Sequence, residues 1–143
     1  MYGNDRAGMR RVFVEAWAKG QAGQPLGALE ALVVELIALH PEYQGLMSSG
    51  EAALEREFPP EAGVSNPFIH LGMHLGLREQ IQADRPAGIR AIHARLLATK
   101  GDPHATDHAM MECLGEALWQ AQREGHPPDD VAYLTCLRRL LES

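Results

Sequence analysis

Apolar residues along this chain recur every three to four positions between segments rich in glycine and proline, and no segment alternates apolar and polar residues as a half-buried strand does. This spacing is typical of helices that bury one face. The pattern therefore predicts an all-α protein: about five main helices and a short one, with a final helix at the C-terminal end, in which sequential helices pack antiparallel. The expected helices cover residues 5–20, 25–40, 48–58, 66–83, 86–100, 103–124 and 131–141.

Residues that favour helix ends mark several of these boundaries. Two helices are expected to begin in the same way, with a capping side chain followed by proline at Asn66–Pro67 and at Asp102–Pro103. The HPEY segment, 40–43, is interpreted as a helix end because proline disfavours helix in the residue before it. Further expected caps are Asp5 at the first helix and a capping box of Ser48 and Glu51 at the short helix.

Composition narrows the class of protein. A chain of 143 residues with 45% hydrophobic and 22% charged residues suits a single helical-bundle domain over 1–143. Its 13 basic residues are scattered among 19 acidic ones, so the sequence predicts no nucleic-acid partner. No apolar run suits a signal peptide or a membrane span, which predicts a cytoplasmic protein without a membrane partner. Cys113 and Cys136 show no paired spacing and are expected to be reduced.

Six of the seven histidines fall on apolar helix faces, and only His126 falls in a predicted turn. His70 and His74 are four residues apart within the apolar stripe of the helix over 66–83. His104 and His108 repeat this arrangement in the helix over 103–124, with Glu112 on the flank beside His108. The remaining two inward histidines are His40, in the helix over 25–40, and His93, in the helix over 86–100.

The order of the helices predicts that the two pairs meet. Short connections make sequential helices antiparallel, so helices two apart in order are expected to run roughly parallel and to begin at the same end of the bundle. His70, His74, His104 and His108 would then share one level, and His40 would reach it from the end of the second helix. His93 lies mid-helix and is ranked below the others, as a core histidine bonded to a carbonyl.

Buried imidazoles that converge need a chemical reason, because each neutral ring must satisfy a donor and an acceptor while protonated rings repel one another. A transition metal ion, zinc or iron before others, supplies that reason. The predicted metal ligands are His70, His74, His104, His108, Glu112 and His40, with one or two ions and with Glu112 as the candidate base of any reaction.

Two alternatives stay open at this point. The histidines could instead form a buried, hydrogen-bonded and pH-sensitive network in a non-enzymatic partner or scaffold protein, where a protein partner or a second copy of the chain would be expected. A third hypothesis is metal-free acid–base catalysis by Glu112 and a histidine.

Several segments carry a resemblance to a known family. HPEY at 40–43, NPFIHLGMHL at 66–75, REQ at 78–80, DRPAGIRAI at 84–92 and HATDHAMMECLGEALWQAQ at 104–122 resemble a bacterial family called domain of unknown function eighteen forty-one. The resemblance implies a small helical bacterial protein and brings no established activity, substrate or cofactor. It also implies that the family's histidines correspond to His40, His70, His74, His104 and His108, and that an aromatic residue can stand in place of His93.

Overall fold

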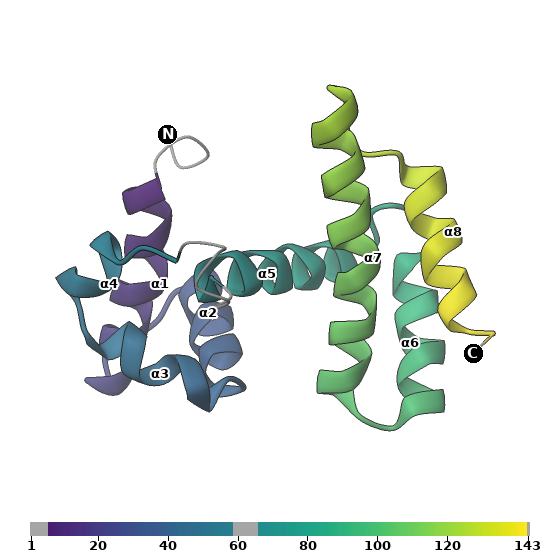
Figure 1. Cartoon of the computed structure of the whole chain (residues 1–143). Helices are drawn as coiled ribbons and strands as arrows, with labels where there is room; N and C mark the ends of the chain where they lie inside the picture. Colours follow the sequence, from purple (N-terminus) through teal and green to yellow (C-terminus); the bar gives the residue numbers. More distant parts are fainter. Residues whose placement is uncertain (1–5, 59–65, 143) are drawn as a thin grey trace. The chain divides into compact units, whose positions relative to one another are not determined.

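The computed structural model describes residues 6–58 and 66–142, and this part of the chain contains eight helices and no strand (Figure 1). The all-α prediction is therefore confirmed. The predicted cap at Asp5 and the loop expected over 59–65 lie outside the described residues. The helices are α1 (Arg6–Gln21), α2 (Ala28–Ala38), α3 (Pro41–Ser48), α4 (Glu51–Glu55), α5 (Pro67–Ala83), α6 (Ile89–Lys100), α7 (Pro103–Glu124) and α8 (Asp130–Leu140).

The predicted helix end before Pro41 is confirmed, but a further helix, α3, begins where the chain was expected to turn. α2 stops at Ala38, and His40 is the N-cap residue of α3 with Pro41 in its first turn. Proline disfavours helix in the residue before it, but its fixed φ suits the first position of a helix. The same proline therefore ends one helix and begins the next, which puts His40 at the junction of the two.

The two starts of cap and proline are confirmed. The side-chain oxygen of Asn66 accepts a hydrogen bond from the N–H of Phe68 at 2.9 Å, and that of Asp102 accepts one from the N–H of His104 at 3.0 Å. Each cap satisfies an N–H that has no partner within its helix. The first turns of α5 and α7, which carry the histidine pairs, are thus fixed locally by their own sequence.

Three other helices begin after a glycine, and not where the sequence predicted. α2 begins after Gly27, whose N–H donates to the Glu30 carboxylate at 2.9 Å, and not at Pro25. α6 follows Gly88 and not Pro86. The short helix α4 follows Gly50, which has a φ of 63° and no side-chain cap, so the expected Ser48 capping box is wrong. Glycine adopts such positive φ values at little cost, which allows a helix to follow a tight turn directly.

The chain forms two compact units whose boundary lies inside α5. The first unit covers residues 1–71 and the second covers 72–143. His40 and His70 belong to the first unit, and His74, His104 and His108 belong to the second. The single domain expected over 1–143 stays a prediction.

α1 organises the first unit. Phe13, Ala16 and Trp17 are spaced three and four apart and are all buried. The Arg10 guanidinium, also buried, donates to the carbonyls of Ala53 at 3.1 Å and Arg56 at 2.7 Å, at the end of α4. These contacts hold α1 against α4, and the buried residues of α2 and α3 complete the core of this unit, namely Val33, Leu36, Ile37 and Met47.

In the second unit α6, α7 and α8 lie side by side (Figure 1). The phenol of Tyr133 on α8 donates to the side-chain oxygen of Gln80 on α5 at 2.7 Å. α5 runs across α7 in Figure 1, so the prediction that these two helices run roughly parallel is wrong. A helix that contributes to two units cannot lie alongside one bundle for its full length. The core consists mainly of Leu77, Ile89, Ile92, Leu96, Met110, Leu114, Tyr133 and Leu137.

A disulfide joins α7 to α8 in the second unit. Cys113 and Cys136 are bonded, with their Cα atoms 5.8 Å apart, so the prediction of two reduced thiols is wrong. Spacing along the chain could not reveal this bond, because the two residues lie on different helices and meet only through tertiary packing.

Replacing both cysteines by serine should lower the free energy of unfolding. The bond closes a loop with a sequence separation of 23 residues, and the entropy of that loop in the unfolded chain corresponds to about 3 kcal/mol. Urea unfolding of oxidised wild type, reduced wild type and the Cys113→Ser, Cys136→Ser double variant measures the difference. Thiol labelling of the native protein is the control: two reactive thiols without added reductant would contradict the bond.

Candidate metal centre

The first two turns of α7 carry a pair of histidines in close contact. The Asp102 cap and Pro103 fix the start of the helix, and His104 and His108 follow one turn apart. Their ring centroids are 4.1 Å apart, and both side chains are partly buried. Two imidazoles at this distance would repel each other if both were protonated. A neutral imidazole is the form that binds metal ions.

His74 on α5 faces this pair within the second unit. Its ring centroid lies 5.9 Å from that of His108 and 6.3 Å from that of His104. His74 is 0% exposed. Three imidazoles from two helices therefore converge in the second unit, as the sequence predicted for these three residues.

Asp107 supports the His74 ring. Its Oδ2 accepts a hydrogen bond from His74 Nε2 at 2.8 Å and another from Arg78 Nε at 2.8 Å. Its Oδ1 lies 3.4 Å from Nε2 of His93 on α6. Burial by itself would raise the pKa of Asp107, but the bonds from His74 and Arg78 outweigh it and hold that pKa at about 2. The carboxylate is therefore ionised at neutral pH.

Sequence reasoning missed Asp107 and the ion pair that it forms with Arg78. A signal was present in the sequence, because Asp107 lies three residues after His104 and four before Met111, and hence on the inward stripe of its helix. An acidic residue on that stripe indicates a buried partner. His93 also contributes more than its sequence ranking suggested, because its Nε2 lies 3.4 Å from Oδ1 of Asp107.

The first unit contains the other histidine contact. His40 Nδ1 lies 2.7 Å from the carbonyl oxygen of Leu36, which can only accept, so this nitrogen donates. In the neutral ring Nε2 is then the acceptor, and His70 Nε2 donates to it at 3.1 Å. Tyr43 stacks on His40 with ring centroids 5.1 Å apart. Burial, followed by the charge of Glu42, raises the pKa of the Tyr43 phenol, which therefore stays neutral.

The predicted ligands are thus distributed over the two units. The structure brings together His74, His104 and His108 in the second unit, and His40 with His70 in the first. His70 and His74 are one turn apart in the uninterrupted helix α5. Glu112 is exposed on α7, one turn beyond His108. The six-residue ligand set as a whole stays a prediction.

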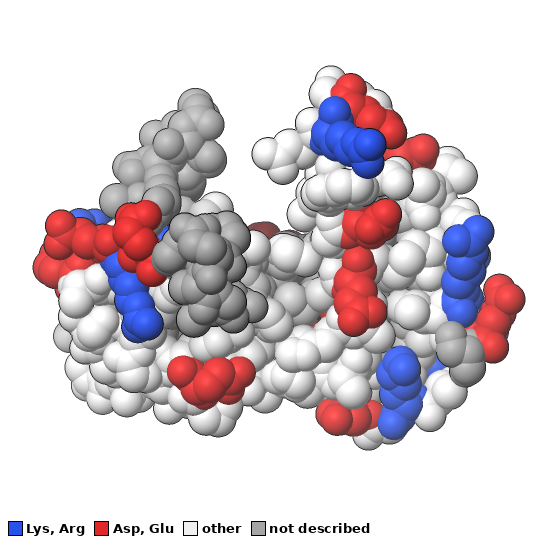
Figure 2. All heavy atoms as spheres, in the orientation of Figure 1, with Lys and Arg blue, Asp and Glu red and all other residues white. Residues whose placement is uncertain are grey.

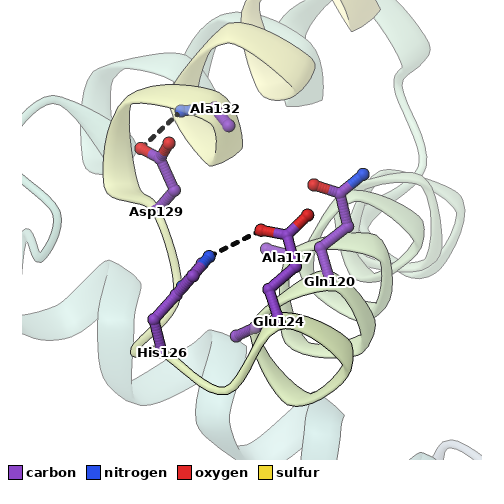
Figure 3. Close-up of a pocket in the computed structure, with 7 residues that line it drawn as sticks. Ala117, Gln120, Glu124, His126, Asp129 and Ala132 are labelled. Atoms are coloured by element: carbon purple, nitrogen blue, oxygen red, sulfur yellow. Dashed lines mark hydrogen bonds and ion pairs between the residues drawn. The ribbon is translucent and has the colours of Figure 1, made fainter.

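His126 lies in the turn between α7 and α8, as predicted, where a small pocket of about 60 Å³ opens (Figure 3). Its ring nitrogens face two acceptors, the Glu124 carboxylate and the carbonyl of Pro127, each at 2.6 Å. Only a doubly protonated ring can donate to both. The bond to Pro127, followed by that to Glu124, raises the pKa of His126 above its usual 6.5. Asp129, at the rim of the same pocket, caps α8.

Charge is mixed on the molecular surface. On the face shown in Figure 2, lysine and arginine side chains are dispersed among aspartate and glutamate. Within residues 6–58 and 66–142, no helix has the length and apolar character needed to cross a membrane. The absence of a nucleic-acid partner, expected from the sequence, stays a prediction.

The fold and the site define an all-helical protein with a buried group of histidines. Comparison with known families identifies it further: residues 5–139 match the domain of unknown function DUF1841, and the chain belongs to this family. No curated protein and no solved structure matches the chain. The family resemblance noted in the sequence is thereby confirmed.

Substituting Glu124 by glutamine should lower the pKa of His126, because the ring loses an anionic acceptor while the Pro127 carbonyl remains. A raised pKa means that the bonds of the protonated ring stabilise the turn in acid and are lost as the pH rises through that pKa. The measurement is the NMR titration of the His126 ring, with a midpoint above 6.5 in the wild type. Glu116→Gln, elsewhere on α7, is the matched control and should leave the midpoint in place. A wild-type midpoint at or below 6.5 would contradict the arrangement.

Proposed function

We propose that this protein binds a transition metal ion, zinc or iron(II), through His74, His104 and His108 of the second unit. The observation that carries the proposal is the His74 ring, fully buried and facing two further imidazoles. Imidazole nitrogen is a preferred ligand of zinc, iron, nickel and copper. Three protein ligands with an open fourth position are typical of zinc sites that activate water.

His70 is the first candidate for a further ligand, because it precedes His74 by one turn of the same helix. His40, hydrogen-bonded to His70, and Glu112, one turn after His108, complete the set predicted from the sequence. A bound ion would act as a Lewis acid or lower the pKa of a bound water, with Glu112 as the candidate base.

The second candidate function is a protein-binding scaffold that contains a hydrogen-bonded histidine network and no ion. The contact between His40 and His70 favours it, because the two rings satisfy each other directly at 3.1 Å. The bond between His74 and Asp107 likewise needs no metal. Under this function the protein would act through a partner or a second copy, and the histidines would fix the core. Under either function, the cytoplasmic location stays a proposal.

Elemental analysis of protein purified without an affinity tag tests the metal proposal. The wild type should retain close to one equivalent of metal, or regain it after chelation, and a hundredfold excess over Kd should add about 2.7 kcal/mol, or roughly 5–10 °C in Tm. His74→Ala and His108→Ala should lose metal and this thermal gain together. His126→Ala, in the α7–α8 turn, is the control and should keep both.

The same measurements distinguish the two functions. Less than about a tenth of an equivalent, with no stabilisation by zinc, iron or nickel, would rule out the metal site. If stability rises in His74→Ala while no metal is lost, the rings are simply buried polar groups. The scaffold function would then be the better account.

A further inference from the structure

Asp107 is an acidic residue of the second unit whose side chain is almost wholly buried. It is 1% exposed and lies in α7 between the two candidate ligands His104 and His108. Both hydrogen bonds that its Oδ2 accepts come from α5: one from His74 and one from Arg78, four residues later. Two donors one turn apart on one helix thus meet a single oxygen on another.

This geometry determines which nitrogen of His74 carries a proton. An ionised carboxylate only accepts hydrogen bonds, so the His74 Nε2, 2.8 Å away, must be the donor. In the neutral ring Nδ1 then holds the lone pair and is the nitrogen available for coordination. A histidine that binds a metal usually donates its other N–H to a carboxylate or carbonyl in this way, which orients the ring and increases its basicity.

We propose that Asp107 is the positioning residue of the metal centre: it holds His74 in the Nε2–H tautomer and presents Nδ1 to the ion. This inference rests on the proposed function. Asp107 itself is not a ligand, because its Oδ2 accepts two hydrogen bonds and its Oδ1 faces His93. Glu112 is exposed and makes no comparable contact among the described residues, so Asp107 is the acid that orients the site.

Arg78 makes the arrangement stable. A buried carboxylate without a compensating charge would take up a proton, and a protonated carboxyl group could donate to His74 and favour the other tautomer. The Arg78 guanidinium, at 2.8 Å, supplies the compensating charge from the same helix as His74. Nε2 of His93, on α6, lies 3.4 Å from the other carboxylate oxygen, Oδ1. Three helices therefore contribute to the orientation of one imidazole.

Histidine NMR on the metal-free wild type gives the first test and requires no variant. Long-range ¹H–¹⁵N spectra distinguish a protonated from an unprotonated ring nitrogen, and we expect Nε2 of His74 to be protonated and Nδ1 not. A His74 ring protonated on Nδ1, or a mixture of both tautomers, would overturn the proposal whether or not metal binds.

Asp107→Asn gives the second test, because an amide of the same shape can donate as well as accept and so permits the other tautomer. We expect the His74 tautomer to become mixed or reversed and the Kd for zinc to rise 10–100-fold. Asp107→Glu retains an accepting carboxylate and should lose less affinity. Glu116→Gln, an exposed acid on the same helix, is the matched control and should bind zinc as the wild type does.

The outcomes separate this inference from the proposed function. If the wild type binds zinc and Asp107→Asn binds it within twofold of the wild type, Asp107 does not position the ligand. If the wild type binds no metal, the proposed function fails, and the NMR tautomer still decides whether Asp107 orients His74. If Asp107→Asn does not fold, the wild-type spectrum and the zinc affinity of Asp107→Glu decide instead.

Discussion

The buried carboxylate of Asp107 is the interaction on which the candidate site depends. Placing an ionised group in the interior is costly unless donors surround it, and here the donors come from α5 while the acceptor belongs to α7. The apolar core of the second unit brings these helices together but does not fix their register. A single anion with two directional bonds does, and in doing so it sets the position of His74 relative to the histidine pair at the start of α7.

Local sequence rules were sufficient for the elements that carry the histidines. Asn66 and Asp102 cap their helices as expected, since capping depends on neighbours within three residues. The rule that proline ends a helix was incomplete at Pro41, because proline also suits the first position of the next helix. Local rules failed at Gly50 and Gly88, because a positive φ before a helix leaves little trace in the apolar pattern.

The site was predictable to the extent that it depends on helical spacing. The convergence of His74 with His104 and His108 follows from their positions on inward stripes, although the reasoning used to align the helices was wrong, since α5 crosses α7. Asp107 and the disulfide of Cys113 and Cys136 depend on which helices meet and at what rotation. Such contacts between distant residues cannot be deduced from the spacing of one chain alone.

The course of α5 through both units has a consequence for how the protein unfolds. Its backbone hydrogen bonds form one continuous ladder, so fraying that begins at Asn66 proceeds past His70 before it reaches the part that packs against the second core. The part of α5 in the first unit can therefore open while residues 72–83 stay helical, and amide exchange along α5 would report on the local stability of each unit in turn.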